Sequence, residues 1–104
     1  MIHKADIVGI LEKEGDIKLI FVEVKEKPLT LKDLGQLWGY TQLIDPEESF
    51  LISPNGLSSL TRVFNILKRE DLLIYGKNRE KMMKVAKWNK KRNTIDYDSL
   101  IPKL

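Results

Sequence analysis

The order of hydrophobic and polar residues changes along the chain, and each stretch predicts a different element. Residues 5–12 and 17–24 are apolar and rich in β-branched side chains, and the polar sequence KEGD separates them. This pattern predicts a β-hairpin, and Pro28 ends its second strand because proline cannot continue a strand ladder. The second strand runs out in two charged residues, Glu23 and Lys25, which point the same way because side chains alternate along a strand.

Residues 30–44 repeat their apolar positions with helical spacing and predict an amphipathic helix. Thr30 is its predicted N-cap, and Asp33 completes a variant of the capping box. The predicted buried face of this helix comprises Leu34, Leu37, Trp38, Thr41 and Ile44.

The rest of the chain continues to alternate between strand and helix patterns. These predict a strand over residues 49–53, a helix over 57–69, a strand over 72–76 and a basic helix over 77–92. The last residues, 93–104, fit no element pattern. Elements in this order predict an α/β or α+β fold with a mixed sheet. We expect a single domain, with residues 1–76 as its core and residues 77–104 adding the basic helix and a tail.

Composition narrows the classes of protein and of site. The 104 residues suffice for one small domain. No apolar stretch approaches the roughly 18 residues of a membrane span, and the start MIHKADIV lacks the apolar core of a signal peptide. We therefore expect an intracellular, cytoplasmic protein without a membrane partner. The lack of cysteine excludes disulfides and thiolate sites, and the single histidine, His3, disfavours a polyhistidine metal site, so oxygen ligands would hold any metal ion.

Basic residues concentrate in residues 76–92, which hold eight lysines and arginines and one acid, Glu80, although the net charge of the chain is only +3. Such an imbalance suggests a polyanionic partner, with nucleic acid as the first candidate. On the predicted helix, the candidate phosphate contacts are Lys84, Lys87 and Lys91. Alternatively, the lysines are only solvated, and the helix docks on the body or on a second subunit through Met82, Val85, Ala86 and Trp88.

The turn of the predicted hairpin sets which residues of its two strands face each other. A two-residue turn at residues 14–15, or a four-residue turn over 13–16, opposes residues whose numbers sum to 29. Asp6 then faces Glu23, with their Cβ atoms about 5 Å apart on the same face as Lys25. A three-residue turn with a bulge would shift this pairing by one. Deeper along the same face, the predicted core residues are Val8, Ile10, Leu19 and Phe21.

Two carboxylates that face each other repel, so this predicted pair requires a cation between them. Mg²⁺ prefers a few carboxylate oxygens and retains several waters, so it fits a pair formed by Asp6 and Glu23. Lys25 adds a positive charge that suits a water nucleophile or a phosphate oxygen. The alternative is that Lys25 only neutralises the carboxylates at the end of a strand.

Four features follow one another in an order typical of one nuclease superfamily, namely Asp6, a hairpin, the triplet EVK at 23–25, and the sequence QLWGY with Gln36 and Tyr40. The chain resembles the PD-(D/E)XK nuclease superfamily, and in particular its RecB-like branch, whose following helix carries a Gln-x-x-x-Tyr motif. The resemblance covers about residues 3–53. Gln36 and Tyr40 point together because they lie four apart on one helix. The alternative is that Tyr40 is a core aromatic and Gln36 a solvated polar residue.

The resemblance implies a restriction-endonuclease-like core with flanking helices, and metal-dependent hydrolysis of DNA phosphodiester bonds with Mg²⁺ or Mn²⁺. The implied metal ligands are Asp6, Glu23 and the backbone carbonyl of Val24. Lys25 would orient the attacking water or help to deprotonate it, and Gln36 and Tyr40 would border the site and complete the set of catalytic candidates.

Two features depart from the family pattern. Family members usually have a helix and a strand before the aspartate, whereas only five residues precede Asp6, and Ala5 stands where the family name has proline. The sheet face left uncovered by the missing helix predicts a homodimer or a larger assembly. Three functions stay open: a nuclease that acts on DNA, including branched or single-stranded ends; a catalytically weak relative that binds nucleic acid or serves in a larger nuclease; and a small protein-interaction domain.

Overall fold

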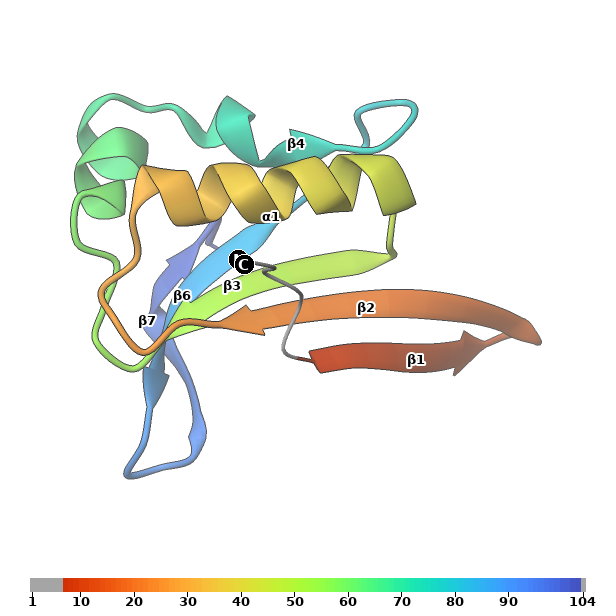
Figure 1. Cartoon of the computed structure of the whole chain (residues 1–104), viewed down its shortest axis with the longest axis horizontal. Coiled ribbons are helices and arrows are strands. Elements are labelled where there is room, and N and C mark those ends of the chain that lie inside the picture. The colour runs from red at the N-terminus through yellow and green to blue at the C-terminus, as the bar shows by residue number, and fades with distance from the viewer. Residues whose placement is uncertain (1–6, 104) are drawn as a thin grey trace.

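In the computed structural model, which describes residues 7–103, a mixed five-stranded sheet carries one α-helix on one of its faces (Figure 1). The strands are β1 (Ile7–Lys13), β2 (Asp16–Val24), β3 (Glu48–Ser53), β6 (Lys84–Asn89) and β7 (Thr94–Ile101). Their order is β1-β2-β3-β6-β7; β2, β3 and β6 are parallel, and the edge strands β1 and β7 are antiparallel to their neighbours. The prediction of an α+β fold with a mixed sheet is confirmed.

The β1–β2 hairpin has the predicted register. Its pairs run from Ile7 opposite Val22 to Lys13 opposite Asp16, so the numbers of opposed residues sum to 29. The turn consists of two residues, both with positive φ (53° and 84°), as the favoured two-residue hairpin turn requires. The predicted contact between Asp6 and Glu23 would be the next pair in this register, but Asp6 lies outside the described residues, and this contact stays a prediction.

The helix α1 (Leu31–Ile44) confirms the predicted helix and its N-terminal cap. The Asp33 N–H donates to Thr30 Oγ1 (3.2 Å), and the Thr30 N–H donates to Asp33 Oδ2 (2.9 Å), so two of the free N–H groups at the helix start are satisfied. Ile44, predicted to be buried, is 52% exposed. It lies in the last turn, and the left-handed Asp45 directs the chain away immediately after it.

Of the two other predicted helices, one is present only in part and one is wrong. Within residues 57–69, only residues 60–66 are helical, and they include the short π-helix η1 (Arg62–Ile66). The basic segment forms β5 (Lys81–Met82) and β6, and the unassigned tail forms β7. Val85 and Ala86 are both buried on opposite faces of β6, because Val85 packs in the main core and Ala86 in a smaller cluster on the other side of the sheet. A strand buried on both faces lacks simple alternation, and its apolar pattern therefore resembled a helix.

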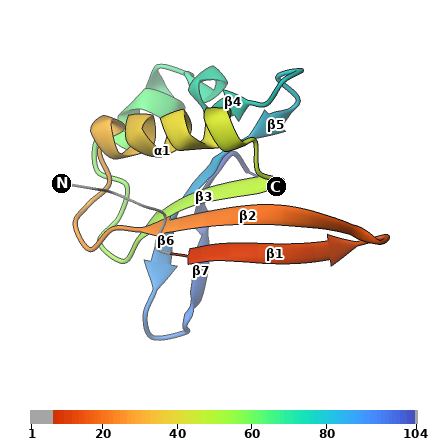
Figure 2. The same ribbon diagram turned by 45° about the vertical axis from the view of Figure 1, so that its right-hand side comes forward.

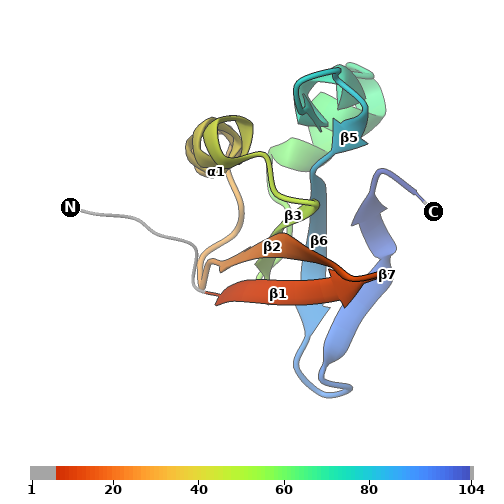
Figure 3. The same cartoon turned by 90° about the vertical axis from the view of Figure 1, so that its right-hand side faces the viewer.

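The predicted strand over 72–76 is present only in part. A 3-10 helix, η2 (Glu70–Leu73), comes first, and β4 (Ile74–Tyr75) pairs with β5 outside the main sheet. Figure 3 shows α1 and the segment that contains β4 and β5 on one side of the sheet. Burial raises the pKa of the Tyr75 hydroxyl, which therefore stays protonated and donates to the Pro46 carbonyl oxygen (2.9 Å).

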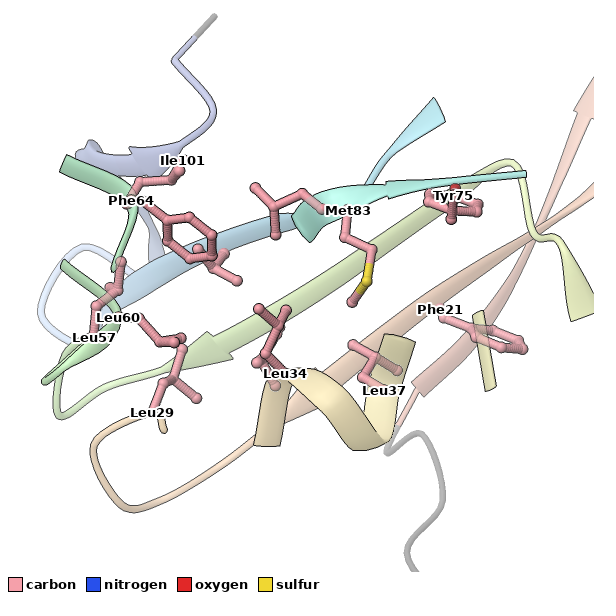
Figure 4. Close-up of a cluster of buried hydrophobic side chains, with 13 residues drawn as sticks. Phe21, Leu29, Leu34, Leu37, Leu57, Leu60, Phe64, Tyr75, Met83 and Ile101 are labelled. Carbon is pink, nitrogen blue, oxygen red and sulfur yellow. The ribbon is translucent and has the colours of Figure 1, made fainter. Parts of the chain in front are cut away.

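The main core lies between the sheet and the elements on its α1 side. Figure 4 shows its side chains, which include Phe21, Leu29, Leu34, Leu37, Leu57, Leu60, Phe64, Tyr75, Met83 and Ile101. A smaller cluster around Ile52, Ala86 and Leu100 covers part of the other face. No helix among the described residues is both long enough and apolar enough to cross a membrane.

Two of the predicted core residues of the hairpin are exposed. Phe21 is buried as predicted, but Leu19 is 37% exposed and Ile10 is 70% exposed, while the side chain of Val8 is outside the described part. The reason is geometric, since the hairpin extends past the end of α1 (Figures 1 and 2). The sequence pattern identified the apolar face but not the length of sheet that the helix covers.

Candidate functional site

Glu23 is the second-last residue of β2, and its side chain is only 2% exposed. It points to the same face as Phe21, which packs in the core beneath α1. Burial of a carboxylate costs several kcal/mol unless positive charge or hydrogen-bond donors accompany it. The structure therefore places an acidic group where a bound cation would stabilise it strongly.

Val24 and Lys25 extend this arrangement beyond the end of β2. The Lys25 N–H donates to the Ile52 carbonyl oxygen (2.9 Å), so the pairing with β3 continues through this residue. Backbone groups alternate in direction along a strand, and the Val24 carbonyl therefore points to the β1 side of β2. The side chain of Lys25, which is half-buried, returns to the face of Glu23.

Gln36 and Tyr40 lie on one flank of α1, above the same sheet face. Trp38 marks the opposite flank, because its Nε1 donates to the Ile74 carbonyl oxygen (3.0 Å) beside β4. At 100° per residue, Gln36 and Tyr40 both project away from that contact. Gln36 is half-buried and Tyr40 is 44% exposed, so Tyr40 is not a core aromatic. Both side chains are accessible on the α1 side of the sheet.

The loop that carries Lys25 is held by residues that the sequence analysis did not single out. Ser53 Oγ donates to the Lys27 carbonyl oxygen (2.8 Å) and accepts from the Asn55 N–H (3.0 Å). The side chain of Asn55 also donates to the Glu26 carbonyl oxygen. The turn sequence SPNG was the available signal, because serine and asparagine beside such a turn commonly bind backbone groups. These bonds join the carboxyl ends of β2 and β3, where ligands usually bind in open α/β sheets.

The three lysines predicted to contact nucleic acid do not form one stripe. Lys84 lies on the face opposite Glu23, with Nζ 3.3 Å from Glu48 Oε1 and 5.4 Å from the centre of the Phe50 ring. Lys87 is exposed beside the end of β3, and Lys91 lies in the turn before β7. Helical spacing of three and four residues would have aligned them, whereas residues an odd number apart in a strand project from opposite faces.

The oxygen donors at the end of β2 are of the kind that Mg²⁺ and Mn²⁺ accept. Among residues 7–103, no three or more His, Cys, Asp or Glu side chains cluster as a ready metal site. Mg²⁺ needs only one or two carboxylates because it retains waters and binds substrate phosphates. The Glu23 carboxylate and the Val24 carbonyl fit such an ion, and the second predicted carboxylate, Asp6, lies outside the described part.

The site thus combines a buried carboxylate, a lysine two residues later and a polar helix flank, all on one side of the sheet. Comparisons with family models, with curated proteins and with solved structures found no match to this chain. A functional assignment therefore depends on the chemistry of these residues.

Proposed function

We propose that the protein is a metal-dependent nuclease that hydrolyses phosphodiester bonds in DNA, with a restriction-endonuclease-like core of the RecB-like PD-(D/E)XK type. The observation that carries this proposal is the position of Glu23, which is 2% exposed at the carboxyl end of β2 with Lys25 two residues further on the same face. An ordinary surface pair at a strand end would be solvated, whereas a buried carboxylate beside a lysine is typical of a functional site.

The chain topology supports the same proposal. The antiparallel β1–β2 hairpin, α1 and the parallel strand β3 follow one another in the order in which the resemblance places the aspartate, the Glu-x-Lys triplet and the Gln-x-x-x-Tyr helix. The connection through α1 brings β3 beside β2, so Glu23 lies opposite Leu51 of the central strand β3. A carboxylate on a paired strand is held more rigidly than one on a loop, as a metal ligand requires.

In the proposed mechanism, Asp6, Glu23 and the Val24 carbonyl would hold Mg²⁺ or Mn²⁺. When bound, the ion supplies Lewis-acid stabilisation of the charge that develops on the phosphate. Lys25 has three N–H donors and would orient the attacking water or bind a phosphate oxygen. Gln36 and Tyr40 would border the site from the flank of α1 and contact the nucleic acid.

The direct test is incubation with labelled single-stranded, duplex and branched DNA in the presence of Mg²⁺, Mn²⁺ or a chelator. We expect cleavage with at least one of the two metals and none with the chelator, because the proposed chemistry requires the ion. Cleavage that persists in chelator, or no cleavage of any substrate with either metal, would contradict the proposal.

Lys25→Ala should reduce cleavage about 10²-fold to 10³-fold, the usual cost of losing one donor that stabilises a transition state. Binding of DNA should change much less, because one phosphate contact is a small part of the electrostatic affinity. Lys27→Ala is the matched control, since Lys27 is an exposed lysine of the same loop. Single-turnover cleavage and DNA binding without metal separate the two effects. Equal cleavage by the Lys25 variant and the wild type would exclude Lys25 from the mechanism.

A second candidate function is a subunit of a larger nuclease, and one feature of the hairpin favours it. Among the hairpin side chains that the structure describes, three large apolar ones are exposed beyond the end of α1, namely Ile10 (70%), Ile17 (71%) and Leu19 (37%). Grouped apolar surface of this kind is typical of contacts between proteins. The cleavage assay separates the two candidates, because a subunit would require its partner for activity.

A further inference from the structure

The turn between β6 and β7 presents three consecutive cations, Lys90, Lys91 and Arg92. All three are exposed, and within residues 7–103 none of them takes part in an ion pair. The turn itself is ordered by a bond from the Arg92 N–H to Asn89 Oδ1 (3.1 Å) and by Asn93 in the left-handed region (φ 55°). We call residues 90–92 the hairpin tip. It therefore carries a charge of +3 on an ordered turn.

Two other lysines of the basic segment are neutralised by ion pairs, which distinguishes them from the tip. Lys81 Nζ lies 3.1 Å from Asp45 Oδ1, and Lys84 Nζ lies 3.3 Å from Glu48 Oε1. Unpaired cations close together repel one another, and this repulsion is relieved when a polyanion binds. Lys77, Arg79 and Lys87 are also exposed and in no ion pair with another described residue, but only the tip places three such cations at consecutive positions.

The sheet places this tip beyond the edge at which Glu23 and Lys25 lie. Val24 is level with Ile52 of β3, and Ile52 is level with Ala86 of β6. The strand β6 then continues to Asn89, so it extends further than the parallel strands β2 and β3. Figures 1, 2 and 3 agree that the β6–β7 hairpin projects past the ends of β2 and β3 and away from α1.

The strand geometry gives a distance between the tip and the proposed site. Three residues beyond Ala86 advance the chain by about 10 Å, and the two strand spacings between β2 and β6 add about 10 Å sideways. The separation between the end of β6 and the proposed site is then about 15 Å, which is longer than the spacing of successive phosphates along one strand of a duplex.

We propose that the hairpin tip binds the phosphate backbone of duplex DNA a few nucleotides from the phosphate that Lys25 and the proposed metal ion would hold. This inference rests on the proposed nuclease function, because that function supplies the second DNA contact, at Glu23 and Lys25. A duplex suits it because its phosphates keep a fixed separation, so two contacts 15 Å apart set the register of the cleaved bond. Phosphate contacts carry no sequence information, so the tip orients the substrate without selecting its sequence.

The test is the salt dependence of duplex binding without divalent metal, measured by fluorescence anisotropy. The combined variant Lys90→Gln, Lys91→Gln and Arg92→Gln should lower the slope of log affinity against log salt by about 2.7, because each neutralised phosphate contributes about 0.9. Between about 50 mM and 200 mM salt, the wild-type affinity should fall about 40-fold further than that of the variant.

The matched control removes two lysines and one arginine elsewhere, through Lys18→Gln, Lys77→Gln and Arg79→Gln together. Lys18 lies near the start of β2, and the other two lie between β4 and β5, so we expect a slope close to that of the wild type. Equal losses in both triple variants, an unchanged slope in the tip variant, or no duplex binding by the wild type would overturn the inference.

The binding test and the cleavage test can fail separately. A wild type that binds duplex DNA through the tip but cuts nothing would leave the tip assignment standing and remove the nuclease. If the wild type cuts DNA but the tip variant has the wild-type slope of log affinity against log salt, the nuclease function stands and the tip assignment is removed. Unfolding curves check that both triple variants are folded. We expect this for the tip variant because residues 90–92 are exposed turn residues, and for the control because Lys77 and Arg79 are exposed and Lys18 is only half-buried.

Discussion

Replacement of Glu23 by glutamine should reduce metal-dependent cleavage by about 10³-fold or more. Glutamine has the same shape but no charge, and it is a weak ligand for Mg²⁺ or Mn²⁺. An ion in the site contributes several kcal/mol to transition-state stabilisation, and each 1.36 kcal/mol corresponds to about tenfold in rate. The fold should survive, because the change removes a charge from a position that is 2% exposed without changing its volume.

Metal binding gives a readout of Glu23 that does not depend on cleavage. At a metal concentration 100 times the dissociation constant, a site present only in the folded protein adds about 2.7 kcal/mol to the free energy of unfolding. Thermal unfolding with and without Mn²⁺ should show this increase for the wild type and little of it for Glu23→Gln. Glu26→Gln is the control, because Glu26 is exposed in the following loop. A full metal effect in the Glu23 variant would place the ion elsewhere.

Leu37→Ala should lower the free energy of unfolding by about 2–5 kcal/mol, as is usual when a buried leucine is truncated. Leu37 is 0% exposed and belongs to the core beneath α1. The loss includes the transfer of its methyl groups and a cavity that the sheet below cannot fill. For a domain of this size, each kcal/mol shifts the unfolding midpoint by about 4–8 °C.

Leu43→Ala provides the control on the same helix. Leu43 is 82% exposed, and its truncation should change the free energy of unfolding by no more than about 0.5 kcal/mol. Urea denaturation of both variants measures the difference directly, because the helix propensities of leucine and alanine are similar. Similar losses in the two variants would show that α1 does not rest on the sheet through the face that contains Leu37.

Local features of the chain were predictable because they depend on neighbouring residues. The register of the β1–β2 hairpin follows from a two-residue turn, and the capping box of α1 follows from Thr30 and Asp33 three positions apart. Glu23 and Lys25 share a face because side chains alternate along any strand. The Gln36 and Tyr40 pair could be placed on one flank of a helix before the surrounding sheet was known, because residues four apart on a helix are neighbours.

The basic segment could not be predicted in the same way. Its lysines are spaced as on a helical surface, but the backbone of β6 is paired on both sides, with β3 and with β7. Those pairs join residues distant in sequence, and no local pattern in the segment specifies them. The tail was unassigned for the same reason, since β7 exists only as the partner of β6.

The sequence by itself determined which oxygen and nitrogen groups are available at the end of β2 and that Glu23 and Lys25 project together. Only the tertiary structure decided that Glu23 is buried, that α1 covers its face, and that the cations of the hairpin tip project beyond the same edge. The physical reason is that direction along a strand is a property of successive residues, whereas burial and the meeting of distant strands depend on long-range packing and pairing.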